Sequence, residues 1–221
     1  MSNRYSHIVF DLDGTLMDTS PGVIRSFTAV EDKLGLRHIT PPEQRSVIGP
    51  PLEDSLLRLY GLEGEDNQHA LDVFNVIYAT PEGAGDSPLY PGVLDTLKKL
   101  KERGVRISIA TMKPWIFTSI CLETKGILDL FDSVVCYEDN SGFTKAQLVL
   151  RALEQAGGKP ENALMVGDSS IDGRGAAEAG LDFAAVVGGF GFAGEEDLAE
   201  IPHVACAELI PGLWEFLDAH I

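Results

Sequence analysis

The chain is short of positive charge, and this shortage excludes several kinds of partner. Its 221 residues include 17 Lys and Arg against 34 Asp and Glu, which gives a formal net charge of −17 at pH 7. Nucleic acids and anionic membrane surfaces are bound through clustered Lys and Arg side chains. We therefore expect no nucleic acid and no membrane as a partner. Wherever the protein holds a small anion, we expect a bound cation or a local basic residue beside it.

Long hydrophobic runs and paired cysteines are also missing. The longest stretch without a polar side chain covers residues 183–194 and is rich in glycine, whereas a membrane helix needs about 20 apolar residues. The first residues lack the apolar segment of a signal peptide. The cysteines, Cys121, Cys136 and Cys206, form no C-x-x-C pair, which argues against a disulfide framework or a cysteine zinc site. These features predict a cytoplasmic protein.

Short apolar or β-branched runs alternate with helical patterns along much of the chain. Helical spacing of apolar residues is found in three segments, each followed by glycine: 91–103, 144–156 and 170–179. The apolar runs, which we interpret as strands, are residues 7–10, 106–110, 133–137, 163–166 and 183–187. This alternation predicts an α/β fold, a doubly wound, mostly parallel, Rossmann-like sheet with helices on both faces.

The interval between the first two predicted strands is unusually long. It runs from residue 11 to residue 105, whereas a crossover between parallel strands needs about a dozen residues. Helical patterns occupy 22–34, 53–60 and 66–78, and the Pro and Gly residues at 41–42 and 49–51 divide them. We therefore predict an α/β core of residues 1–16 and 89–221, with a small helical cap domain of residues 17–88 inserted into it.

Acidic and hydroxyl side chains follow three of the predicted strands. Asp11 and Asp13 come after the first, Thr111 after the second, and Asp168 and Asp172 after the fourth. In an open α/β sheet, ligands bind beyond the carboxyl ends of the strands. If these strands are neighbours, several carboxylates share one site, and each close pair costs on the order of 4 kcal/mol at roughly 4 Å and an effective dielectric of 20. A cation, or a proton on one carboxyl group, must offset that repulsion.

A ligand set made only of oxygens predicts Mg²⁺ rather than a softer metal. A metal ion beside a surplus carboxylate suits phosphoryl transfer, because the spare carboxylate can attack as a nucleophile. Asp-x-Asp-Gly is also a common turn after a strand, and this alternative stays open for the pair taken alone. An EF-hand calcium loop is excluded, because it needs Gly and Glu where the chain has Leu16 and Gly22.

Four segments resemble the motifs of the haloacid dehalogenase-like hydrolases, and they occur in the same order. Residues 10–19, FDLDGTLMDT, resemble the first motif, and residues 107–111, ISIAT, resemble the second. Lys145, at the start of a predicted helix, resembles the third, and residues 165–172, MVGDSSID, resemble the fourth. Two further segments, YPGV at 90–93 and IGPPL at 48–52, resemble the phosphoglycolate phosphatase-like branch, whose members have a small helical cap.

The resemblance implies a Mg²⁺-dependent phosphomonoester hydrolase acting on a small phosphorylated metabolite, either phosphoglycolate-like or a nucleoside monophosphate. Asp11 would be the nucleophile that forms an aspartyl-phosphate. Asp13 would protonate the leaving oxygen and then activate water. Asp11, the main-chain carbonyl of Asp13, and Asp168 would hold Mg²⁺, with Asp172 close to the ion.

The same resemblance assigns residues to the phosphoryl group and the substrate. Thr111 and Lys145 would hold the phosphoryl oxygens. Lys113 competes with Lys145 for that role, and Asp172 has a simpler explanation as an acid at the start of a helix. The residues expected to contact the substrate are Gly14, Met112, Lys113, Gly49 and Pro50.

Two other functions on this fold stay open. A phosphosugar mutase keeps both acids of the first motif, but its branch typically has a His shortly afterwards, and residues 20–25 contain none. A catalytically silent binding or regulatory protein is opposed by the intact set of acids, Thr111 and Lys145. We expect a monomer or a homodimer.

One motif fits none of these roles. Residues 189–194 match G-x-G-x-x-G, but a dinucleotide fingerprint opens the first βαβ unit, and this segment follows the last predicted strand. We interpret it as a flexible loop near the mouth of the site. The aromatic residues Trp115, Phe117 and Trp214 are expected in the core.

Overall fold

The centre of the protein is a six-stranded parallel sheet. The computed structural model describes residues 4–48, 52–137 and 142–221, so Gly49 and Pro50 lie outside the described residues. The strand order is β3-β2-β1-β4-β5-β6, and every neighbouring pair is parallel. The strands are β1 (His7–Phe10), β2 (Arg106–Pro114), β3 (Ser133–Tyr137), β4 (Ala163–Gly167), β5 (Asp182–Val186) and β6 (Ala205–Ala207).

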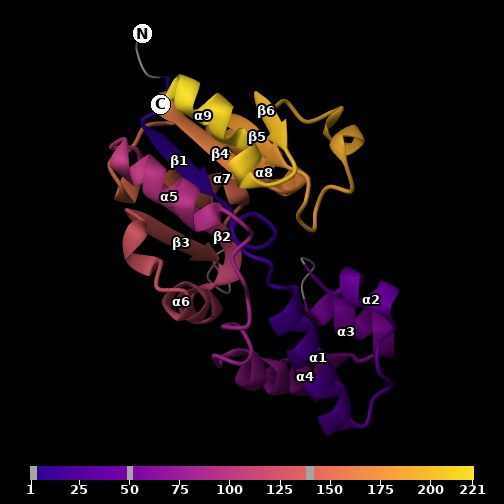
Figure 1. The fold of residues 1–221 in the computed structure, drawn as a ribbon. Helices are drawn as coiled ribbons and strands as arrows, with labels where there is room; N and C mark the ends of the chain where they lie inside the picture. The colour runs from indigo at the N-terminus through magenta and orange to yellow at the C-terminus, as the bar shows by residue number, and fades with distance from the viewer. Residues whose placement is uncertain (1–3, 49–51, 138–141) are drawn as a thin grey trace.

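Helices cover both faces of this sheet (Figure 1). Alternate residues of β1 point to opposite faces, because the side chains of a strand have a period of two. Ile8 and Phe10 join one hydrophobic cluster, and Val9 joins the other. The first cluster includes residues of α5 (Val93–Glu102), α6 (Trp115–Thr124) and α9 (Trp214–His220), and the second includes residues of α7 (Lys145–Gln155) and α8 (Ser170–Ala179). The predicted doubly wound α/β fold is confirmed.

Five helices lie between β1 and β2, and the first four are grouped at one end of the molecule beyond the sheet (Figure 1), whereas α5 packs on the sheet. We call the first four the helical lobe. Its two connections to the core run side by side, since Asp18 N–H donates to Pro88 O and Tyr90 N–H donates to Leu16 O. The predicted boundaries at residues 17 and 88 stay a prediction. The helices of the lobe are α1 (Ser20–Leu34), α2 (Pro41–Ser46), α3 (Leu52–Tyr60) and α4 (Gly64–Tyr78).

Helix α2 begins at the Pro41-Pro42 pair, which the sequence analysis treated as a divider between helices. The first turn of a helix has no use for its N–H groups, so proline is well tolerated there. Glu43 then accepts hydrogen bonds from the N–H and the hydroxyl of Thr40, which completes the start of the helix. Single-turn helices are η1 (Leu128–Leu130), η2 (Pro160–Asn162), η3 (Glu195–Leu198) and η4 (Ile210–Leu213). None of the helices in the described ranges is both long and apolar enough for a membrane crossing.

The sheet topology brings three strand ends together. Strand β1 lies between β2 and β4, with Phe10 level with Ile109 on one side and Val166 on the other. The strands are parallel, so the residues that follow them emerge at the same edge. Strand β2 runs past the predicted end at residue 110, so Thr111 lies within it, just before the register shifts against β3. The acids after β1, the Thr111 hydroxyl and the acids after β4 therefore share this edge.

Candidate active site

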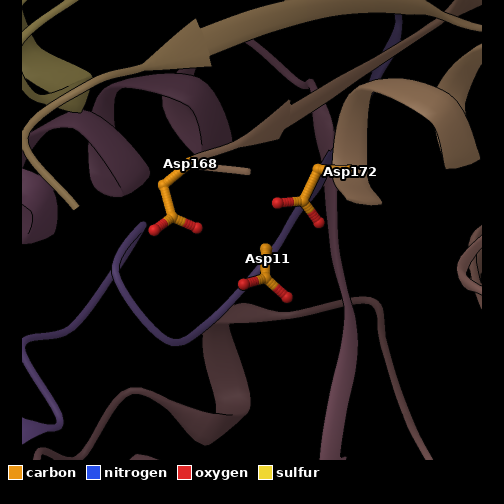
Figure 2. Close-up of side chains that lie close together, drawn as sticks. All are labelled: Asp11, Asp168 and Asp172. Atoms are coloured by element: carbon orange, nitrogen blue, oxygen red, sulfur yellow. The ribbon is translucent and has the colours of Figure 1, made fainter. Parts of the chain in front are cut away.

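Three carboxylates converge at this edge. Asp11 continues the ladder of β1, since its N–H donates to Val166 O at 2.9 Å, and its side chain is turned inward. Asp168 follows β4, and Asp172 lies in the first turn of α8. One oxygen from each of Asp11, Asp168 and Asp172 lies within 4.8 Å of the others, and all three residues are buried. Figure 2 shows the three side chains lying close together.

One lysine faces this group of acids. The Nζ atom of Lys145 lies 2.5 Å from Asp11 Oδ1 and 2.8 Å from Asp172 Oδ1. Burial alone lowers the pKa of Lys145, but the charges of Asp11 and Asp172 outweigh it and raise the pKa overall. Lys145, at the start of α7, is therefore buried and paired with the acids instead of facing solvent.

The negative charge at the site exceeds what Lys145 can balance. Burial, together with Asp172 and Asp168, raises the pKa of Asp11 well above its ordinary value despite the opposing effect of Lys145. Burial and Asp172 raise the pKa of Asp168 to about 6. Three buried carboxylates beside one ammonium group leave a deficit of positive charge, and a divalent cation is suited to fill it. Oxygen ligands alone fit a hard ion such as Mg²⁺.

Local structure fixes Lys145 and Asp172 in these places. Thr144 caps α7, accepting a hydrogen bond from Gln147 N–H while Gln147 Oε1 accepts one from Thr144 N–H. The Asp172 Oδ2 atom accepts hydrogen bonds from the N–H and hydroxyl of Ser169, at 3.0 and 2.6 Å. The other oxygen of Asp172 faces Lys145. Asp172 thus caps its own helix and also positions the lysine.

Asp13 lies outside the group of three carboxylates and has its own lysine. Lys113 Nζ lies 2.7 Å from Asp13 Oδ1 and 5.2 Å from the centre of the Tyr78 ring, at the end of α4. Burial alone lowers the pKa of Lys113, but Asp13 and Tyr78 raise it overall. The two lysines that competed for one role in the sequence analysis therefore have separate partners. Thr111 is buried within the last part of β2, and its Oγ1 accepts a hydrogen bond from Lys113 N–H at 3.1 Å.

The turn after the two acids requires glycine. Gly14 has φ +78°, and a Cβ atom there would lie 2.2 Å from Asp168 Oδ2. The next residue, Thr15, donates a 3.4 Å hydrogen bond from its hydroxyl to Asp168 Oδ1. Met112 is 42% exposed beside Thr111. The predicted contacts of Gly49 and Pro50 fall outside the described residues.

Two contributors were missed by the sequence analysis. Tyr78, in the helical lobe, reaches the Lys113–Asp13 pair, but its position follows the ordinary spacing of a buried helix residue. The main-chain N–H groups of Phe190 and Gly191 donate to Asp168. Main-chain N–H donors cannot be recognised from the residue type, because nearly every residue has one. The sequence signal for this contact was the glycine pattern at residues 189–194, which we interpreted as a flexible loop.

Comparison with known proteins agrees with the motif order and the strand topology. The sequence pattern of the Haloacid dehalogenase-like hydrolase family matches residues 8–186. The chain belongs to the haloacid dehalogenase-like hydrolase family. It is 33% identical over 216 residues to the tyrosine-protein kinase PtkA of Mycobacterium tuberculosis, covering 95% of this chain and 72% of that protein. It is 30% identical over 219 residues to a 5'-nucleotidase of Pseudomonas aeruginosa, covering 98% and 97%.

Further relatives and solved structures extend this likeness. A phosphoglycolate phosphatase of Agrobacterium fabrum is 30% identical over 218 residues, covering 95% of this chain and 92% of that protein. A haloacid dehalogenase-like family hydrolase from Streptococcus pneumoniae has a TM-score of 0.84 at 27% identity, covering 96% and 98% of the two chains. The structure of PtkA has a TM-score of 0.80 at 30% identity, covering 98% and 99%. This chain therefore shares its fold with these two solved structures along nearly its whole length.

Proposed function

We propose that this hydrolase is a Mg²⁺-dependent phosphomonoesterase that works through an aspartyl-phosphate on Asp11. The observation that carries the proposal is the group formed by Asp11, Asp168 and Asp172 with the buried ammonium group of Lys145. Such a group has a nucleophile, a place for a divalent ion and a fixed positive charge at one strand edge. The names of the relatives, a kinase, a nucleotidase and a phosphatase, have phosphoryl transfer in common.

The first half of the proposed reaction uses both acids of the first motif. An oxygen of Asp11 attacks the phosphorus atom, and the bond from phosphorus to the leaving oxygen breaks. Asp13 gives its proton to that oxygen, so the alcohol leaves neutral. Lys145 and the hydroxyl of Thr111 hold the phosphoryl oxygens as charge spreads over them.

The second half releases phosphate. Asp13 takes a proton from a water molecule, whose oxygen attacks the phosphorus atom of the aspartyl-phosphate, and Asp11 leaves as a carboxylate. Lys113 holds the Asp13 carboxylate in place between the two halves. Asp11, Asp168 and the main-chain carbonyl of Asp13 would hold Mg²⁺, with Asp172 nearby. When bound, the ion neutralises charge on the acids and the phosphoryl group.

We propose that the substrate is a small phosphorylated metabolite and that the helical lobe acts as a cap over it. Phosphoglycolate and nucleoside monophosphates are the leading classes, and names of relatives support both. The lobe contacts the core site through Tyr78 and Lys113, so its position bears directly on Asp13. A cap of this kind excludes water and selects the leaving group.

The test is turnover of a panel of phosphomonoesters with and without Mg²⁺. We expect hydrolysis of an aryl phosphate to require the ion, and phosphoglycolate or a nucleoside monophosphate to have the highest kcat/KM. Asp11→Asn removes the nucleophile and should lower turnover by about 10⁴-fold or more. Asp95→Asn, an exposed change of the same chemistry on α5, is the matched control. Retained turnover in Asp11→Asn would contradict the proposed mechanism.

A further inference from the structure

The glycine-rich segment after β5 lies against Asp168. Phe190 N–H and Gly191 N–H donate to Asp168 Oδ2 at 2.7 and 3.1 Å. Phe192 N–H donates to the main-chain oxygen of Asp168 at 3.0 Å. The main-chain N–H groups of three consecutive loop residues therefore bind Asp168, two at its side chain and one at its main-chain oxygen.

The glycines are there because the loop approaches so closely. A Cβ atom on Gly189 would lie 2.3 Å from Asp168 Oδ2 and 2.4 Å from Gly14 O. A Cβ atom on Gly191 would lie 2.5 Å from the Cβ of Ser169 and 2.7 Å from Asp168 O. These separations are far below van der Waals contact, so any side chain at either position must push the loop away from Asp168.

The remaining residues anchor the loop on the core. Phe190 packs against the hydrophobic cluster on one face of the sheet, and Phe192 is buried in the cluster on the other face. At the start of the loop, Gly188 N–H donates to Glu208 O at 2.8 Å, next to β6. These contacts tie the loop to the core at several points along its length.

We propose that residues 188–192 form a positioning loop that sets the orientation of the Asp168 carboxylate for Mg²⁺. This inference rests on the proposed function. The loop occupies Oδ2 with two amides, and Oδ1 accepts the longer hydrogen bond from Thr15. Groups that orient a metal ligand from outside the coordination sphere change metal affinity by about 10- to 100-fold when they are lost.

The experiment compares Gly191→Ala with Gly194→Ala in the full chain. Gly194 has an extended backbone, and its nearest contact to an added Cβ would be 3.9 Å, so alanine fits there without strain. Isothermal titration calorimetry with MgCl₂ as the only ligand measures the Mg²⁺ affinity directly. We expect Gly191→Ala to bind Mg²⁺ about 10- to 100-fold more weakly than the wild type, and Gly194→Ala to bind as the wild type does.

Turnover as a function of Mg²⁺ concentration separates positioning from general damage. The half-saturating Mg²⁺ concentration of Gly191→Ala should rise by the same factor, and saturating Mg²⁺ should restore most of kcat. If Gly191→Ala does not fold, Phe190→Ala decides the question. It keeps the amide donor but removes the anchoring ring, and the half-saturating Mg²⁺ concentration should again rise.

The two proposals fail in different ways. A wild-type protein that neither binds Mg²⁺ nor hydrolyses phosphomonoesters removes the proposed function. A wild type that does both, beside folded Gly191→Ala or Phe190→Ala proteins with unchanged Mg²⁺ affinity, removes the positioning loop and leaves the proposed function standing.

Discussion

The sheet core and the helical lobe differ in how many of their buried polar side-chain atoms lack a hydrogen-bond partner. In the core, Asp168, Asp172, Lys145 and Ser133 each have hydrogen-bond or charge partners. Within the described residues of the core, His7 Nδ1 is the buried side-chain atom without a protein partner. The helices of the lobe have several such atoms, namely Ser26 Oγ, Glu31 Oε2, Ser55 Oγ and Asn67 Oδ1.

This contrast has a physical consequence. A buried polar atom without a partner lowers stability by about 1–3 kcal/mol. A region with several of them is held less firmly than one whose polar groups are all satisfied. The contrast therefore predicts that the core is held more firmly than the lobe, as the cap role proposed above would require.

The largest expected effect is the loss of a partner in the core. Lys145→Met leaves Asp11 and Asp172 buried without their cation. We expect the free energy of unfolding to fall by about 3–5 kcal/mol, because breaking a buried ion pair exposes the full desolvation penalty of the remaining charge. Turnover should fall by about 10²- to 10³-fold with the loss of a phosphoryl contact. Urea unfolding and aryl phosphate kinetics measure the two effects.

Lys98→Met, on the exposed face of α5, is the matched control for this change. It should alter the free energy of unfolding by less than about 0.5 kcal/mol. Saturating Mg²⁺ should recover part of the stability of Lys145→Met, because the ion supplies charge to the same carboxylates. Equal stability of Lys145→Met and Lys98→Met would show that the ion pairs of Lys145 contribute no more to folding than an exposed lysine does.

A second effect comes from His7, the exception in the core. Burial and the charge of Arg106 lower its pKa from 6.5 to about 4, against the opposing effect of Asp132. The unfolded chain therefore binds a proton at a pH where the folded protein does not. The contribution of His7 is complete above pH 6.5 and is lost as the pH falls toward 4, by about 3 kcal/mol in total.

Urea unfolding from pH 7.5 to 4 measures this effect as the difference between the wild type and His7→Leu. The variant cannot titrate at this position, so its stability should fall less steeply in that window. His69→Leu, an exposed change in the lobe, should keep the wild-type slope. Parallel curves for the wild type and His7→Leu would mean that His7 is protonated in both states or in neither.

The parts of the fold that could be predicted are those with a strong local pattern. Residues 7–10 and 133–137 form strands with the predicted ends. The first of them is a nearly continuous apolar run, as expected of a strand covered on both faces. Helix α6 was not predicted, because its apolar side chains lie all around the helix and give no one-sided pattern. The prediction that Trp115 lies in the core was wrong, since this residue is 49% exposed. Strand β6 is too short to give a pattern.

At the site, the acids could be predicted and their supports could not. Asp11 and Asp168 are marked by residue type and by their place after strands. The contacts that hold Asp168 come from main-chain N–H groups, which every residue except proline has. The contact of Tyr78 with Lys113 joins residues from separate parts of the chain and depends on how the lobe packs on the core. Such contacts follow from tertiary structure alone.

A smaller effect should come from a single hydroxyl in the core. Ser133 Oγ lies 2.7 Å from Ala152 O, to which it donates, and 2.8 Å from Ser108 Oγ. Ser133→Ala removes these contacts and leaves the buried Ser108 hydroxyl with fewer partners. We expect the free energy of unfolding to fall by about 1–2 kcal/mol, measured by urea unfolding at pH 7.5. No change would mean that satisfied hydroxyls do not stabilise the core.

The same substitution in the lobe should have the smallest effect and the opposite sign. Ser55 is 1% exposed on α3, and its hydroxyl has no partner within the protein. Ser55→Ala removes an unsatisfied polar atom and adds a better helix former, so the free energy of unfolding should stay level or rise by up to about 1 kcal/mol. The two serines differ in their hydrogen bonds and little in burial, so a difference larger than the few tenths of a kcal/mol that helix propensity contributes reports polar satisfaction. If Ser55→Ala lowers stability as much as Ser133→Ala does, the polar groups of the lobe are as well satisfied as those of the core, and the proposed difference in firmness between the two regions is wrong.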